Sequence, residues 1–115
     1  MTKLLTIVEL PGFLRDATQE LSEESLEDLK SFLAAHPETG VVIKGTGGVR
    51  KLRWAASGRG KSGGSRVIYY FHSEIMPLFL IAFFKKGEKT DLTEKEKQEA
   101  KKLVETLVKQ FGRVE

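Results

Sequence analysis

Hydrophobic residues in the first third of the chain follow the spacing of one strand and then two helices. Residues 2–10, TKLLTIVEL, are apolar and β-branched, which predicts a first strand. Pro11 suits the first turn of a helix, Ser22 suits the N-cap of a second helix, and Pro37 ends that second helix. The helical stripes are Phe13, Leu14, Ala17 and Leu21, then Leu26, Leu29, Phe32 and Leu33. We expect the two helices to form an antiparallel hairpin.

Beyond Pro37 the pattern changes to that of strands, followed by one long helix. Thr93 is the expected N-cap of this last helix, and Glu96 completes a capping box. The strand-like segments are VVIK (41–44), VRKLRWA (49–55), SRVIYYFH (65–72) and PLFLIAFF (77–84). The order β-α-α-β-β-β-α predicts one α+β domain over residues 1–115. We expect an antiparallel twisted sheet with the helical hairpin on one face and a C-terminal helix.

Charge is distributed unevenly along the 115 residues, although the formal net charge is only +3. Residues 1–40 contain three Lys or Arg and eight Asp or Glu, whereas residues 41–90 contain ten and two. Residues 44–66 contain seven cations and no acid. A cationic stretch of this length predicts a polyanionic partner, although a solvated basic surface has the same composition.

The composition also excludes several classes of protein. With no cysteine, the chain has no disulfide framework and no thiolate metal site, and it fits a reducing cytoplasm. No apolar run reaches the roughly 18 residues of a membrane-spanning helix, so we expect no membrane partner. His36 and His72 are far apart in the sequence, and we expect neither a metal site nor a cofactor.

Alternation along the central strands places the cations on one face of the sheet. Lys51 and Arg53 share a face opposite Leu52 and Trp54. In the next strand, Arg66 and Tyr70 share a face. If the apolar face packs against the helical hairpin, the other face presents a basic patch with an aromatic ring. Such a patch suits RNA phosphates and a stacked base, although core packing of the tyrosine is the alternative.

The glycine-rich segment between these strands, AASGRGKSGGSR (55–66), matches only part of a phosphate-binding loop. Gly60 and Lys61 fit its end, but Ala55 occupies the first glycine position, and a strand rather than a helix follows. We therefore expect a hairpin loop whose Arg59 and Lys61 contact a phosphodiester chain, and not a nucleotide site.

The segment after the last strand, KKGEKTDLT (85–93), mixes amines with carboxylates. Lys85 and Lys86 lie where the strand ends, and Glu88 and Asp91 follow. These groups could perform acid–base work on a phosphodiester, although an ordinary charged connection has the same composition.

Several motifs together resemble the HigB-like branch of the RelE/ParE toxin superfamily. They are G-x-G-G-x-R-K-x-R, G-x-G-K-x-G-G-x-R-x-I-Y-Y and K-x-E-x-x-D-L, and they cover residues 40–93 in detail. The resemblance implies a cytoplasmic toxin of a type II toxin–antitoxin module, inhibited by a HigA-like helix-turn-helix antitoxin. It also implies a RelE-like fold and metal-free cleavage of mRNA in the ribosome.

The resemblance assigns roles to particular residues. Arg66 is expected to contact the scissile phosphate, with Lys61 and Lys86 as cationic or acid partners and Glu88 as base or as a residue orienting Lys86. The expected RNA-binding residues are Lys51, Arg53, Arg59, Tyr70 and Lys85. RelE itself has an arginine where this chain has Gly87 and a late tyrosine where it has Thr93, so the proton acceptor is open.

Two other functions fit the same sequence. One is a ParE-like inhibitor of DNA gyrase, and the other is a non-catalytic module that binds RNA or the ribosome. The density of cations in residues 44–66 and the K-x-E-x-x-D-L motif favour the nuclease.

Overall fold

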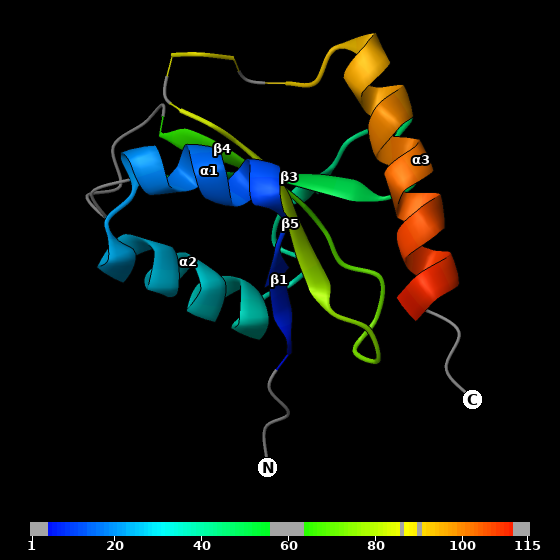
Figure 1. Ribbon diagram of the computed structural model, residues 1–115, viewed down its shortest axis with the longest axis horizontal. Helices are drawn as coiled ribbons and strands as arrows, with labels where there is room; N and C mark the ends of the chain where they lie inside the picture. The colour runs from blue at the N-terminus through cyan, green and yellow to red at the C-terminus, as the bar shows by residue number, and fades with distance from the viewer. Residues whose placement is uncertain (1–4, 56–63, 86, 90, 112–115) are drawn as a thin grey trace.

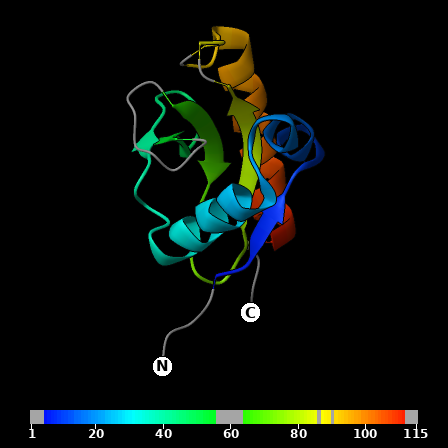
Figure 2. The same cartoon turned by 90° about the vertical axis from the view of Figure 1, so that its left-hand side faces the viewer.

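A five-stranded sheet lies between two layers of helices in the computed structural model, with α1 and α2 on one side and α3 on the other (Figure 1). The structure describes residues 5–55, 64–85, 87–89 and 91–111. The strands are β1 (Ile7–Glu9), β2 (Val41–Val42), β3 (Val49–Trp54), β4 (Ser65–Tyr70) and β5 (Leu78–Phe84). The helices are α1 (Pro11–Glu20), α2 (Glu23–Ala35) and α3 (Glu94–Phe111). Figure 2 shows the hairpin of α1 and α2 in front of the sheet and α3 behind it.

The strand order β1-β5-β4-β3-β2 confirms the α+β class and corrects two details of the sequence prediction. β1 pairs with β5 in parallel, so the sheet is mixed and not wholly antiparallel. Val41 and Val42 form a short fifth strand at the opposite edge, paired with β3. The predicted order β-α-α-β-β-β-α had not counted that strand.

Local sequence signals set the helix ends as predicted. Pro11 begins α1, and the Ser22 hydroxyl caps α2 by accepting from the N–H of Ser25 at 3.0 Å. At the start of α3, Thr93 and Glu96 form the reciprocal capping box. The Thr93 N–H donates to Glu96 Oε1 at 2.8 Å, and the Glu96 N–H donates to Thr93 Oγ1 at 3.1 Å.

Two apolar cores form, one on each face of the sheet. Phe13, Leu29 and Leu33 of the hairpin are fully buried against one face, where Leu52 and Trp54 are half-buried, as the alternation predicted. Ala100, Val104 and Leu107 of α3 pack on the other face. Each large side chain buried in this way contributes about 1.5–3 kcal/mol.

A β-bulge in β5 decides which side chains share the face covered by α3. Ile68 pairs with Ala82 and Tyr69 with Leu80, so Ile81 is an extra residue without a partner. Ile81 and Ala82 therefore both pack toward α3. The bulge reverses the alternation beyond it, so that Phe84, and not Phe83, lies on the same face as its partner Arg66.

Candidate functional site

Two arginines face each other across the central strands, near the end of β3 and the start of β4. The register pairs Arg53 of β3 directly with Arg66 of β4, which puts both side chains on the α3 face. Arg53 is exposed and Arg66 is half-exposed, so α3 does not cover them. Like charges directly opposite each other destabilise a sheet, and an anion held between them would remove that cost. The pair is therefore suited to a phosphate.

Lys51 extends the cationic face from this arginine pair. It lies two residues before Arg53 on β3 and pairs with Ile68. Its Nζ is 3.5 Å from Oδ2 of Asp91, in the segment that joins β5 to α3. The Arg66 guanidinium donates to the carbonyl oxygen of Gly64, which steadies the side chain without burying it. We call Lys51, Arg53 and Arg66 the cationic face.

The segment after β5 begins with a tight turn. The Lys85 N–H donates to Glu88 Oε1 at 3.2 Å, and the Glu88 N–H donates to the Lys85 carbonyl at 3.0 Å. Gly87 has φ +85°, which glycine adopts without strain. This positive φ favours glycine at position 87 over a residue with a side chain. Both Lys85 and Glu88 remain exposed.

Lys89 anchors the middle of this segment, and the sequence analysis did not single it out. Its Nζ lies 2.7 Å from both carboxylate oxygens of Glu96 and 4.7 Å from the centre of the Phe84 ring. Because Phe84 pairs with Arg66, this cation–π contact joins the segment to the same part of the sheet. In the sequence, Lys89 stands seven residues before the capping-box residue Glu96, and that spacing alone does not predict a contact. The two side chains meet only in the folded protein.

Two carboxylates of this region, those of Asp91 and Glu96, are held as anions by their neighbours. The N–H of Leu92, and then the charge of Lys51, lower the pKa of Asp91. For Glu96, the hydrogen bond from Lys89 and then that from the Thr93 N–H lower the pKa. The positive charge of the sheet face therefore lies beside two ionised acids at neutral pH.

Tyr70 is placed differently from the sequence prediction. Only 5 % of it is exposed, because it packs in the core beneath α3, and Gly48 lies against its ring. Its hydroxyl lies 3.2 Å from Nδ1 of the exposed His72. The expectation that this ring stacks on an RNA base is therefore wrong for this structure, and the core-packing alternative holds.

The other candidates divide between described and undescribed residues. Arg59 and Lys61 in the hairpin loop, and Lys86 after β5, lie outside the described residues. His36 is the C-cap of α2. Where the structure describes the chain, no three His, Asp or Glu side chains gather in a way that could hold a metal ion. In the same residues, no helix is long and apolar enough to cross a membrane.

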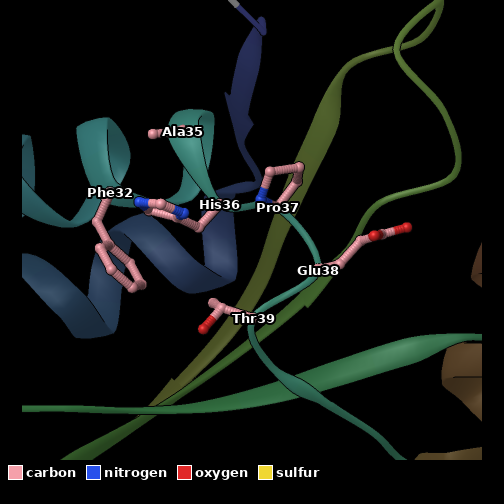
Figure 3. Close-up of a pocket in the computed structure, with 6 residues that line it drawn as sticks. All are labelled: Phe32, Ala35, His36, Pro37, Glu38 and Thr39. Carbon is pink, nitrogen blue, oxygen red and sulfur yellow. The ribbon is translucent and has the colours of Figure 1, made fainter.

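Two of the hollows in the described surface are lined by none of the three residues of the cationic face. The larger, about 480 Å³, is at the end of α2, and none of the predicted catalytic or RNA-binding residues lines it (Figure 3). Its lining is Phe32, Ala35, His36, Pro37, Glu38 and Thr39. The Glu38 carboxylate makes it a poor phosphate site. The second, about 200 Å³, separates α3 from the sheet and is apolar except for Glu96 and Glu99.

The family model of the RelE toxin of the RelE/RelB toxin–antitoxin system matches residues 19–112. This match covers α2, α3, only the last two residues of α1, and every strand except β1. The chain belongs to the RelE toxin family. The family assignment therefore identifies the protein as a toxin of a toxin–antitoxin system. It does not identify the HigB-like branch.

A solved structure agrees with this family assignment at the level of the fold. The free E. coli toxin RelE, in a form with two arginines replaced by alanine, superimposes with a TM-score of 0.52 at 18% sequence identity. The alignment covers 94% of this chain and 98% of that one. The shared fold accounts for the layer order, whereas the chemistry has to be argued from the residues of this chain.

Proposed function

We propose that this RelE-family toxin is an endoribonuclease that cleaves mRNA on the ribosome in the cytoplasm, and that a HigA-like antitoxin inhibits it. The observation that carries the proposal is the Arg53–Arg66 pair on the uncovered end of the sheet. Two guanidinium groups opposite each other repel, and a polyanion bound between them removes that repulsion. The acid-free cationic stretch of the sequence, residues 44–66, supplies this face.

The proposed reaction is attack of the ribose 2′-oxygen on the adjacent phosphorus. The P–O5′ bond breaks, a 2′,3′-cyclic phosphate forms, and the 5′-oxygen leaves with a proton. Positioning of the attacking oxygen in line can contribute about 7–11 kcal/mol to the lowering of the barrier. A preorganised cation on the developing phosphorane charge contributes about 3–4 kcal/mol. This chemistry requires no metal ion.

Arg66 is the proposed phosphate stabiliser, because it is the half-exposed cation at the centre of the face. Lys61 and Lys86 are proposed as cationic or acid partners, and Lys51, Arg53, Arg59 and Lys85 as RNA contacts. Glu88 is proposed as the base that accepts the 2′-hydroxyl proton, or as the residue that orients Lys86. Its exposed carboxylate keeps Oε2 for this role while Oε1 accepts from the Lys85 N–H.

Growth arrest in cells, followed by primer extension on their transcripts, tests the proposal. Induced wild-type protein should stop growth and cut messages within translated regions. Arg66→Ala should do neither, whereas the control Arg15→Ala, an exposed arginine on α1, should behave as wild type. Antitoxin binding should be kept in both variants, and thermal melts should show that both are folded.

Other outcomes would refute the nuclease. Intact transcripts with induced DNA-damage signalling would indicate a gyrase inhibitor. Harmless expression of a protein that binds RNA would indicate a non-catalytic module. A fully toxic Arg66→Ala variant would remove Arg66 from the reaction.

A further inference from the structure

Asp91 contacts a lysine of the cationic face. Its Oδ2 is 3.5 Å from Nζ of Lys51, on the face that also carries Arg53 and Arg66. A carboxylate and a phosphodiester both present anionic oxygens to a lysine, so the two groups compete for the same donor. The negative charge at this position comes from the protein itself.

Described residues on either side of Asp91 contact the rest of the protein. On one side, Lys89 is bound to Glu96 and lies over the Phe84 ring. On the other side, Leu92 packs into the core beneath α3, and its N–H donates to Asp91 Oδ1 at 2.8 Å. The remaining oxygen, Oδ2, is the one that contacts Lys51.

The contact with Lys51 is weak enough to be displaced. The Asp91 side chain is 52% exposed and the Lys51 side chain 27%. Exposed ion pairs at such separations change equilibrium constants by no more than about fivefold. In contrast, Lys89 contacts both oxygens of Glu96 at 2.7 Å, and the capping box also holds Glu96. The anchor at Lys89 can thus persist while the contact at Lys51 opens.

We infer that Asp91 is an internal competitor for RNA: its carboxylate occupies Lys51 in the free protein and is displaced by a substrate phosphate. This inference rests on the proposed function, because it assigns a regulatory contact to the same cationic face. Its consequence is an affinity penalty of at most about fivefold for any anion that binds Lys51, which RNA offsets by also engaging Arg53 and Arg66.

Binding of an uncleavable RNA tests the inference. The probe is a short, fluorescein-labelled single-stranded RNA with 2′-O-methyl riboses, which lack the attacking hydroxyl. Asp91→Asn keeps the acceptor for the Leu92 N–H and removes the charge. We expect it to bind the probe about two- to fivefold more tightly than wild type at low salt. The plot of log affinity against log salt should become steeper by up to about 0.7.

Two controls separate a contact with Lys51 from a general change of charge. Asp28→Asn removes the same charge from the exposed surface of α2, on the other side of the sheet, and should change affinity much less. In a Lys51→Ala background, Asp91→Asn should give no further tightening, since the residue for which it competes is gone. Thermal melts of all variants check that each is folded.

Two results would overturn the inference while leaving the proposed function intact. In the first, wild type binds the probe and Arg66→Ala does not, yet Asp91→Asn binds no better than Asp28→Asn. In the second, Asp91→Asn binds more weakly than wild type, which would mean that Asp91 positions Lys51 for RNA. If wild type itself fails to bind the probe, the inference fails, and growth arrest with primer extension decides the proposed function separately.

Discussion

Replacing Arg53 with glutamine should make the protein more stable and weaken its binding to RNA. Arg53 is exposed and lies directly opposite Arg66 in the register. Cross-strand charge pairs are worth about 0.2–1 kcal/mol, and charges about 5–8 Å apart in water repel by about 0.5–0.8 kcal/mol. Removing one charge should therefore raise the free energy of unfolding by about 0.5 kcal/mol. The melting temperature should rise by about 2–4 °C.

The same substitution removes a charge-assisted contact to phosphate, worth about 1.5–3 kcal/mol. RNA affinity should therefore fall by about 10- to 100-fold. Thermal melts at low salt and fluorescence anisotropy with an uncleavable RNA measure the two effects. In 1 M salt the gain in stability should vanish, because the screening length falls to about 3 Å. Lys102→Gln, on an exposed part of α3, is the control and should change neither quantity appreciably.

The reasoning would be refuted if Arg53→Gln lost stability at low salt or bound RNA as tightly as wild type. Loss of stability would mean that the two guanidinium groups do not repel each other in the free protein. Unchanged affinity would mean that RNA does not use this end of the sheet. Either result would leave the family assignment unchanged, because that assignment does not depend on these charges.

Three further predictions concern the framework that holds the site. Tyr69→Phe should lower the free energy of unfolding by about 2–4 kcal/mol in urea titrations. The buried hydroxyl accepts from the Gly40 N–H at 2.8 Å and donates to the Pro37 carbonyl at 2.9 Å, so an unchanged unfolding midpoint would contradict those bonds. Gly87→Ala should cost about 1–2 kcal/mol through the positive φ, and a melting temperature equal to wild type would show that the turn is not formed. Stability should fall as the pH drops below about 4, because the Glu96 pKa is lower in the folded protein, so ionised Glu96 stabilises the fold and its protonation removes that contribution. Glu96→Gln should lose less stability over the same pH range. An identical pH profile would exclude the pair of Glu96 and Lys89 as the source of the loss.

The sequence predicted the faces of the central strands because alternation there is unbroken. Leu52 and Trp54 pack toward the hairpin, and Lys51, Arg53 and Arg66 share the opposite face. Tyr70 could not be placed in the same way, since an aromatic residue in an alternating strand fits a buried or an exposed position equally well. Its burial depends on where α3 packs, which is a tertiary outcome.

Other features depend on contacts between distant segments and carry no local signal. The parallel pairing of β1 with β5 joins residues about seventy positions apart. The bulge at Ile81 lies in an unbroken apolar run, where no change of pattern marks it. Lys89 contacts Phe84, and Asp91 contacts Lys51. Both contacts form because the segment after β5 passes across the end of the sheet on its way to α3 (Figure 1). Composition alone could indicate that charges gather there but not which pairs form.

The most direct test of the central claim is an NMR titration of the isotopically labelled protein with the 2′-O-methyl RNA. We expect the largest chemical-shift changes at Lys51, Arg53 and Arg66 and in the segment from Lys85 to Asp91, with little change in α1 and α2. Changes concentrated on the helical hairpin, or around the hollow at the end of α2, would contradict it.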